Sequence, residues 1–375
     1  MPHRRERVLV AMSGGVDSSV AACLLHESGA EVVGVWMRLH DVADTYSEFR
    51  RSCCSLDAAE DARRVAGQLG IPFYVLNLER EFGRGVLQPF LDAYLAGETP
   101  SPCVDCNSTV KFGALLGQAR RLYDCDAVAT GHYARIAGGV PGAQRGAPSG
   151  GYRLLAARDA EKDQSYFLYG LRQDQLARSR FPLGELNKPE VRAIARRHGL
   201  ATADKPESQE ICFVPGGDYR EELRARAGWQ PTPGPLVDTD GALVGQHQGA
   251  AAYTVGQRRG LRVALGEPRY VTRIDALANL VQLGRREELL WRRFSLRDVS
   301  FVSGAPPSGD AFEAAVRIRH RAVPVAALVR RRGAGTRAWE VETEQPVWAP
   351  APGQAAVFYA GDEVLGGGRI APAAA

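Results

Sequence analysis

The sequence contains no hydrophobic run that approaches the roughly 20 residues of a membrane-spanning helix. Residues 1–7 are basic, but the apolar stretch that follows, residues 8–12, is too short for the core of a signal peptide. The hydrophobic fraction of 45% and the charged fraction of 24% are typical of a globular protein. We therefore predict a globular, cytoplasmic protein without membrane association.

Lysine is scarce, since only Lys111, Lys162, Lys188 and Lys205 stand among 47 basic residues. Ammonium and guanidinium groups differ in size and donor geometry, so each lysine in an arginine-rich chain is a candidate for a specific role. Arginines cluster instead in residues 317–321 and 330–332. Such basic patches permit nucleic-acid binding without proving it.

The chain has seven cysteines, an odd number, and no secretion signal. This combination argues against a disulfide framework and favours thiol or metal chemistry. Cys23 and Cys125 are predicted to be core residues, whereas a role for the adjacent Cys53 and Cys54 stays open. At 375 residues the chain exceeds one ordinary core, which favours two or three domains.

In residues 8–20, VLVAMSGGVDSSV, an apolar strand runs into a glycine-rich turn and then a helix. Gly14 and Gly15 allow close backbone approach, and the helix directs unpaired N–H groups and its positive dipole end toward an anion. The Walker spacing G-x-x-x-x-G-K-[ST] is absent, while Asp17 suggests a Mg²⁺ ligand beside pyrophosphate. The alternative is a tight turn that happens to hold two glycines, but the flanking elements favour an ATP site.

Strand and helix patterns alternate through the first 135 residues. We predict strands at 7–12, 31–37, 72–78 and 127–130, and helices at 18–28, 56–69, 83–96 and 111–123. This alternation predicts an α/β fold with a parallel sheet covered on both faces, and ligands at the carboxyl ends of its strands. Ser13, Met37 and Gly131 all fall at that edge.

The composition changes along the rest of the chain. Residues 137–151 are rich in glycine, proline and alanine and predict a surface insertion, and helical periodicity returns at 188–198. After Cys212 the sequence is of β type. We predict a catalytic domain at 1–215, a small central domain at 216–284 and a C-terminal β-barrel at 285–375.

A C-x-x-C pair, Cys103 and Cys106, lies in residues 99–107, TPSPCVDCN. We predict a proline-stiffened loop here, followed by a helix that begins near Val110. A thiol near a helix N-terminus has a lowered pKa and therefore more of the nucleophilic, metal-binding thiolate. A structural zinc site would need two further ligands. Cys212, in the segment ESQEICFV, is by itself consistent with a core thiol.

The segment SGGVDS resembles the PP-loop of ATP pyrophosphatases, which adenylate a substrate oxygen and release pyrophosphate. With it, the chain resembles the tRNA-specific 2-thiouridylase family over nearly its whole length. The further motifs that carry this resemblance, in the family's order, are residues 99–107, 131–135, 162–165, 211–213, 247–249, 254–258 and 352–355.

The resemblance implies a PP-loop domain, a central tRNA-binding adaptor domain and a C-terminal β-barrel. The activity it implies is ATP-dependent 2-thiolation of the wobble uridine of tRNA, with ATP and Mg²⁺ as cofactors. The expected partners are tRNAs for lysine, glutamate and glutamine, and a sulfur-carrier protein or cysteine desulfurase.

The resemblance also implies residue roles. Cys106 and Cys212 are expected to be catalytic. The ATP site is expected to comprise Ala11, Met12, Ser13, Gly14, Gly15, Val16, Asp17, Ser18, Met37 and Gly131. The residues expected to face the target base are Ser101, Pro102 and Cys103. The residues expected to contact tRNA are His132, Lys162, Asp163, Gln164, Arg319, His320 and Gln354.

The chain departs from the family pattern at two places. Residues 101–103 read Ser-Pro-Cys where many members have Asn-Pro-Asp, so the usual carboxylate is absent, and Asp105 cannot be assumed to replace it. Where the family usually has an Arg-Tyr pair, this chain has Arg319-His320. Period-2 alternation across residues 317–321 predicts that Arg317, Arg319 and Arg321 share one strand face, as a phosphate-binding surface would require.

Two sulfur chemistries fit these residues. In one, a Cys212 persulfide attacks the activated C2 of uridine and Cys106 then releases the sulfur, which leaves a disulfide. In the other, Cys103, Cys106 and Cys212 hold a [4Fe–4S] cluster whose fourth iron carries sulfide. Two rival functions are an amidotransferase-type synthetase, for which no glutaminase-like domain is apparent, and a metal-bound RNA-binding protein, which leaves the PP-loop unexplained.

Overall fold

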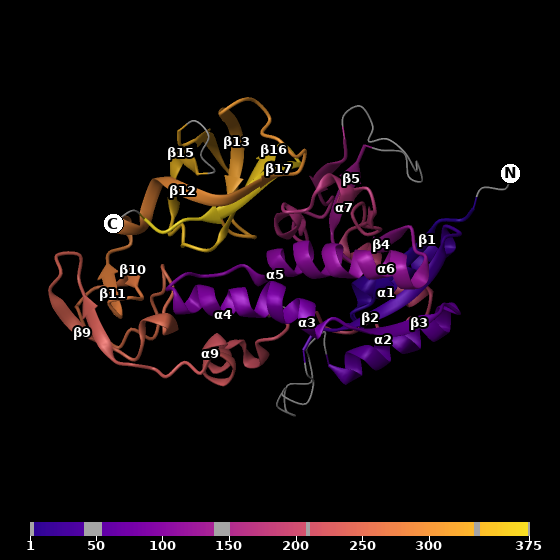
Figure 1. Ribbon diagram of the computed structural model, residues 1–375, viewed down its shortest axis with the longest axis horizontal. Coiled ribbons are helices and arrows are strands. Elements are labelled where there is room, and N and C mark those ends of the chain that lie inside the picture. Colours follow the sequence, from indigo (N-terminus) through magenta and orange to yellow (C-terminus); the bar gives the residue numbers. More distant parts are fainter. Residues whose placement is uncertain (1–3, 41–54, 139–150, 208–210, 334–337, 374–375) are drawn as a thin grey trace.

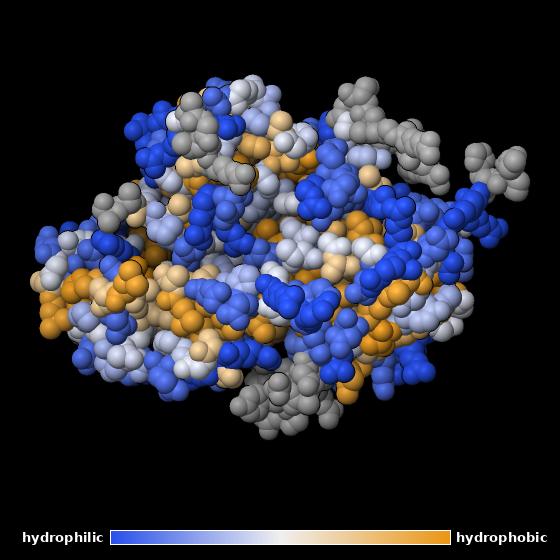
Figure 2. Space-filling model, viewed as in Figure 1, coloured by the Kyte–Doolittle hydropathy of each residue, from blue (hydrophilic) through white to orange (hydrophobic). Residues whose placement is uncertain are grey.

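A computed structural model describes residues 4–40, 55–138, 151–207, 211–333 and 338–373 of the chain. The described strands form three sheets, one in each of three regions of the molecule (Figure 1). No helix in these residues is long and apolar enough to cross a membrane. Over the face in Figure 2, hydrophilic residues are interspersed with smaller apolar patches.

The first region is built on a parallel sheet with strand order β3-β2-β1-β4-β7. Its strands are β1 Arg7–Ala11, β2 Glu31–Arg38, β3 Phe73–Asn77, β4 Ala127–Ala129 and β7 Ser179–Arg180. Leu9 faces one hydrophobic core, and Val8 and Val10 face another, because helices cover both faces of the sheet. The predicted α/β class is confirmed, and the first four predicted strands end within one residue of these bounds.

Helices connect these strands and follow the last of them, and they cover both faces of the sheet. They are α1 Val16–Glu27, α2 Leu56–Leu69, α3 Glu79–Phe82, α4 Gln88–Leu95, α5 Pro102–Asp105, α6 Leu115–Tyr123, α7 Gln173–Leu176, α8 Lys188–Arg197 and α9 Tyr219–Ala227. Two π-helical segments, Gly83–Leu87 and Cys106–Ala114, join α3 to α4 and α5 to α6. α2 has the predicted bounds because Ser55 caps its first turn and Gly70, at φ +67°, ends it.

The prediction of a loop before a helix near Val110 is wrong. The helix begins eight residues earlier, at Pro102, so Cys103 and Cys106 lie within helical turns. Proline is well suited to the first helical position, because its missing N–H would be unpaired there anyway and its φ is already helical. Pro102 therefore starts a helix, and Pro100 lies before it.

The second region is a small four-stranded sheet of order β10-β11-β8-β9. Its strands are β8 Gly234–Val237, β9 Leu243–His247, β10 Tyr270–Asp275 and β11 Leu280–Gly284. The buried His247 ring accepts a hydrogen bond from Gly249 N and lies 2.9 Å from Asn279 O. This histidine of the 247–249 motif therefore stabilises the turn after β9 through its hydrogen bonds.

The third region is a closed barrel. Its strands are β12 Leu290–Phe301, β13 Ala311–Arg317, β14 Val325–Arg331, β15 Trp339–Trp348, β16 Ala355–Ala360 and β17 Glu363–Ile370, and β12 pairs with β17 to complete the circle. The predicted β-barrel is confirmed, with Trp339 in its core. A hairpin from the first region, β5 Ala134–Ala137 with β6 Arg153–Ala156, adds to the edge of β17.

The predicted arginine face of residues 317–321 is wrong. β13 ends at Arg317, and a turn follows in which Ala322 N bonds to Arg319 O. Arg317 donates to Asp163 of the first region, and Arg319 donates to Ala349 O. Arg317 thus contacts the first region, whereas Arg319 contacts the segment after β15 within the barrel, so the two side chains do not share a strand face.

Candidate active site

The glycine-rich turn between β1 and α1 has the shape that its sequence predicts. Gly14 adopts φ +69°, and a Cβ there would lie 2.1 Å from Ala58 O, so only glycine fits. Ser18 Oγ accepts from Ser13 N and donates to Gly15 O, which fixes the turn. Gly15 is the N-cap of α1 and provides no side-chain cap. The first N–H groups of α1 are therefore available to an anion.

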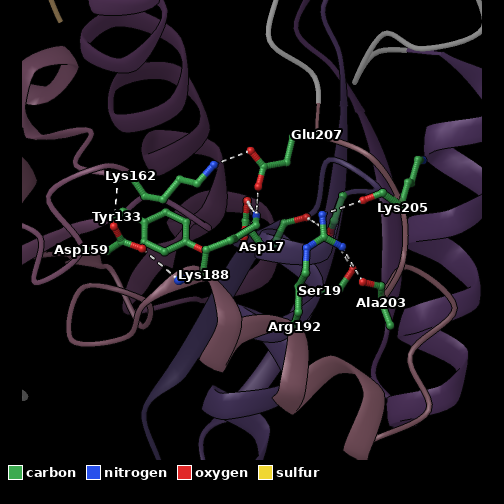
Figure 3. Close-up of polar contacts among 12 residues, drawn as sticks. Asp17, Ser19, Tyr133, Asp159, Lys162, Lys188, Arg192, Ala203, Lys205 and Glu207 are labelled. Atoms are coloured by element: carbon green, nitrogen blue, oxygen red, sulfur yellow. Dashed lines mark hydrogen bonds and ion pairs between the residues drawn. The ribbon is translucent and has the colours of Figure 1, made fainter. Parts of the chain in front are cut away.

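Asp17, in the first turn of α1, is surrounded by polar groups from distant segments (Figure 3). Lys188 Nζ donates to both carboxylate oxygens, at 2.7 and 2.8 Å, and Tyr133 Oη donates to Oδ1 at 2.8 Å. Lys188 is only 8% exposed and begins α8. Both α1 and α8 thus direct their N-terminal ends, with their positive dipoles, toward the same place.

Glu207 and two further lysines extend this network. Glu207 accepts from Lys162 Nζ at 2.8 Å and lies 2.6 Å from Lys188 Nζ. Burial opposes ionisation of Glu207, but the hydrogen bonds from both lysines lower its pKa to about 2. On the other side of the turn, Lys205 donates to Gly14 O at 2.9 Å and to Asp61 at 2.6 Å. Lys188 and Lys205 therefore contact the glycine-rich turn and the first turn of α1, and Lys162 joins them through Glu207.

The three candidate cysteines line one pocket. Cys103 is exposed, Cys106 is buried and Cys212 is intermediate in burial. The pocket, of about 190 Å³, reaches from Met12 and Ser13 at the end of β1 to these thiols. The residues that complete its lining are Trp36, Met37, Leu39, Phe82, Val86, Pro102, Lys111, Ile211 and Phe213.

The pocket brings residues from five segments of the chain to the carboxyl edge of the sheet. Lys111, the fourth lysine, lies on its wall with Cys106, one helical turn earlier in the π-helical segment. π-Helical turns are rare and are frequently found at functional sites. The arrangement therefore places thiols, an ammonium group and the end of an anion-binding turn around one space.

Known proteins resemble this chain over nearly its whole length. The tRNA-specific 2-thiouridylase MnmA of Roseiflexus sp. (strain RS-1) is 52% identical over 97% of this chain and 99% of its own length. The proteins of the same name from Chloroflexus aurantiacus and Geobacter metallireducens are 51% and 50% identical, over 97% and 98% of this chain and 98% and 97% of their own lengths. The chain belongs to the tRNA-specific 2-thiouridylase family. The identification from its motifs, and with it the prediction of an enzyme, is confirmed.

Three family domains match the chain in order. The tRNA methyl transferase HUP domain matches residues 6–216, the tRNA methyl transferase PRC-barrel domain matches 226–285, and the aminomethyltransferase beta-barrel domain matches 291–370. These ranges contain, respectively, the parallel sheet, the four-stranded sheet and the closed barrel.

In the structure, the residues expected at ATP divide into two groups. Met12, Ser13 and Met37 line the cysteine pocket, whereas Asp17 lies in the lysine network. Gly131 lies against the first turn of α1, since a Cβ there would come within 2.7 Å of Asp17 C and Ser18 N. Its lack of a side chain lets β4 end against the first turn of α1.

Several residues expected to contact tRNA bind other parts of the protein in this structure. Asp163 is 4% exposed and accepts from Ala157 N, Ser165 and Arg317, and its carbonyl lies 2.7 Å from His320 Nε2. Gln164 accepts from Tyr133 N. These contacts tie the barrel to the first region.

His132 and Gln354 likewise make internal contacts. His132 is 9% exposed, its Nδ1 lies 2.7 Å from Thr130 Oγ1, and burial, followed by the charge of Lys111, lowers its pKa well below the ordinary value. Gln354 donates to Thr99 O and Pro100 O, at 3.1 Å each. Direct tRNA contact by these residues stays a prediction.

The segment before Cys212 contains Glu207, which binds Lys162 and Lys188 and which the sequence motifs did not identify as functional. Tyr133, Lys188 and Lys205 were likewise absent from the predicted ATP site. The scarcity of lysine was the signal that could have identified Lys188 and Lys205 as functional. Cys53, Cys54 and residues 208–210 lie outside the described part of the chain.

Proposed function

We propose that this protein catalyses ATP-dependent 2-thiolation of the wobble uridine of tRNA. One observation carries the proposal, namely that a single pocket is shared by the two kinds of group. Met12 and Ser13, where the anion-binding turn begins, line it together with Cys103, Cys106 and Cys212. Adenylation and sulfur transfer must both reach C2 of one base, which requires the two machineries to share a space. The relatives named as tRNA-specific 2-thiouridylases support the same reaction.

ATP would bind with its phosphates at the glycine-rich turn. The N-terminal end of α1, Lys188 and Lys205 supply positive charge there, where charge develops as pyrophosphate leaves. Mg²⁺, held by the Asp17 carboxylate, would neutralise the phosphates of ATP. Because Lys188 occupies both oxygens of Asp17, the lysine and the metal ion compete for this carboxylate.

The chemistry follows from uracil. Its C2 oxygen is a poor leaving group, so it first attacks the α-phosphate of ATP, and the bond to pyrophosphate breaks. The terminal sulfur of a Cys212 persulfide then attacks C2, and AMP leaves with the former C2 oxygen. The Cys106 thiolate attacks Sγ of Cys212, which breaks the sulfur–sulfur bond and frees the thiocarbonyl. The resulting Cys106–Cys212 disulfide is reduced by an external thiol before the next cycle.

The burial of the cysteines agrees with these roles. Cys212 is partly exposed and is positioned to receive sulfur from a carrier protein or cysteine desulfurase, whereas Cys106 is buried. The three thiols on one pocket also fit the donor set of a [4Fe–4S] cluster, which Cys103, Cys106 and Cys212 would hold and which would supply a bound sulfide. The expected substrates are tRNAs for lysine, glutamate and glutamine, which share a modifiable wobble uridine.

The test is the formation of 2-thiouridine by single cysteine variants. We expect Cys106→Ser and Cys212→Ser each to abolish it, because a serine oxygen neither carries nor releases sulfur. Cys125→Ser is the control, because this thiol is buried, donates to Tyr123 O and does not line the pocket. Burial raises its pKa to about 11. Nucleoside mass spectrometry of tRNA from a thiouridine-deficient host supplies the readout. Full thiolation by Cys212→Ser would contradict both sulfur chemistries.

Cys103→Ser separates the two chemistries. If persulfide transfer between Cys212 and Cys106 suffices, this variant retains substantial activity, and anaerobically purified protein contains no iron. If three thiolates hold a cluster, the same change removes iron and activity together. Iron and sulfide analysis on the wild type and on Cys103→Ser therefore accompanies the nucleoside measurement.

A further inference from the structure

Helices α1 and α8 lie side by side, and each end of the pair carries a polar contact. At the first turns Asp17 meets Lys188, and at the far end Glu27 of α1 meets His198, the C-cap of α8. At a rise of 1.5 Å per residue, the two contacts are about 15 Å apart along α1. The far contact is therefore separate from the cysteine pocket and from the glycine-rich turn.

A thiol joins the far contact. Cys23 lies four residues before Glu27, so both side chains project from one face of α1 toward His198. One donor atom from each of Cys23, Glu27 and His198 lies within 4.8 Å of the other two, and His198 Nε2 is 3.1 Å from Glu27 Oε1. In the described part of the chain these residues are the single group of this kind.

The three side chains form a donor set typical of zinc, which takes thiolate, imidazole and carboxylate ligands in a tetrahedral arrangement. Cys23 is 1% exposed, while the Glu27 side chain is 46% exposed, so the group has a buried floor and an open side. His198 Nε2 is shielded from solvent and makes no hydrogen bond of good geometry within the described residues. A metal ion would satisfy this nitrogen, and water could complete the coordination from the open side.

We propose that Cys23, Glu27 and His198 bind a thiophilic divalent cation, of which Zn²⁺ is the type. The thiol proton leaves to solvent on binding, the imidazole stays neutral, and the thiolate and carboxylate balance the two positive charges of the ion. A neutral complex suits a site with a buried floor, where an unbalanced charge is costly.

The electrostatics of the metal-free site favour the thiol form of Cys23, whose proton a bound ion must displace. Burial raises the pKa of the Cys23 thiol, and Glu27 raises it further, while Arg197 acts in the opposite direction. Without an ion the thiol is thus protonated at neutral pH. The ion would tie the last turn of α1 to the end of α8, and both helices begin at the lysine network. Its role would be to hold these two helices in register.

The experiment isolates Cys23 as the remaining thiol. The other six cysteines are replaced, five by serine and the buried Cys125 by alanine, and Co²⁺ is titrated as a spectroscopic substitute for Zn²⁺. We expect one Co²⁺ per chain with a near-ultraviolet thiolate-to-cobalt band, and a Tm that rises with Zn²⁺ concentration. Cys23→Ser in the same background is the matched control and should show neither signal.

His198→Gln in that background should also remove the band, because glutamine keeps the size but supplies no imidazole nitrogen. Absence of the band in the folded Cys23-only protein, or a band unchanged by His198→Gln, would overturn the proposal. If the multiply substituted protein does not fold, Zn²⁺ stoichiometry is compared between the wild type and Cys23→Ser alone. One Zn²⁺ fewer in the variant supports the site, and an equal number refutes it.

Discussion

At the scale of single residues, Asp17 and Lys188 form the central contact of the glycine-rich turn. Lys188 is nearly buried, and Asp17 and Glu207 together provide the carboxylates that balance its charge. A buried ammonium group is costly unless it is paired, which explains why two carboxylates surround it. Binding of a polyphosphate would offer Lys188 a third set of oxygens.

We predict that Asp17→Ala abolishes ATP-dependent activity and leaves tRNA binding largely intact. The carboxylate is lost where Mg²⁺ would be held, but no RNA contact is removed. The measurement is tRNA-stimulated pyrophosphate release, together with tRNA binding by filter retention. Asp124→Ala, an exposed carboxylate after α6, is the control and should behave as the wild type. Release at the wild-type rate by Asp17→Ala would remove the proposed role of the turn.

The lowered pKa of Glu207 predicts how stability depends on pH. The pKa falls from 4.5 to about 2 on folding, so the carboxylate stabilises the fold above pH 4.5 and loses this contribution as pH falls through 2. We expect the stability difference between the wild type and Glu207→Gln to be constant above about pH 5 and to shrink below it. Urea unfolding from pH 7 to pH 3 measures this difference. A difference that does not change with pH would show that Glu207 is not ion-paired.

At the scale of elements, α5 connects the cysteine pocket to the barrel. Pro102 and Cys103 face the pocket, while Asp105 of the same short helix binds Arg369 of β17. Burial raises the pKa of Asp105, and Arg369 counteracts the effect. Asp105 anchors the helix that carries Cys103 and Cys106.

We predict that Arg369→Met destabilises the protein by about 2 kcal/mol, because it leaves the partly buried Asp105 carboxylate without its partner. The double variant Asp105→Asn, Arg369→Met should recover part of this loss. The free energy of the first unfolding transition in urea measures both. Arg293→Met, which breaks an exposed pair with Glu342, should leave stability nearly unchanged. Additive effects of the two substitutions would show that Asp105 and Arg369 are not coupled.

At the scale of the whole molecule, the barrel is locked onto the first region. β6 extends the sheet of β17, Tyr166 donates to Ala355 O, and Arg297 pairs with Glu98. Arg317 also takes part in this docking, and Arg319 donates to Ala349 O within the barrel. Of the three arginines at 317, 319 and 321, the exposed Arg321 in the turn after β13 is therefore the one we expect to meet a phosphate.

We predict that tRNA binding weakens steeply with salt, since each neutralised phosphate adds about −0.9 to the slope of log K against log salt concentration. Arg321→Gln should flatten the slope by about one such contact. The measurement is tRNA affinity across a salt series. Arg64→Gln is the control, since this exposed arginine belongs to α2, a helix that lies far from the barrel in Figure 1. An unchanged slope for Arg321→Gln would exclude this turn from the RNA surface.

The sequence by itself determined the features that depend on short stretches of chain. The strand, turn and helix of residues 8–20 are set by a run of apolar residues and by Gly14, whose left-handed φ excludes other side chains. The alternation of strands and helices predicts a parallel sheet because its period is local. The ordered motifs were sufficient to identify the family.

Only the tertiary structure decided which groups meet. Lys188 reaches Asp17 across 171 residues, and Arg369 reaches Asp105 across 264, and no local pattern encodes either pairing. The same reason accounts for the wrong prediction at residues 317–321, where docking against Asp163 ends a strand that alternation would continue. Local propensity therefore determines the helices and strands. The pairing of buried charges determines the site, because a buried charged group is stable only beside an opposite charge, and the tertiary fold decides which residue supplies it.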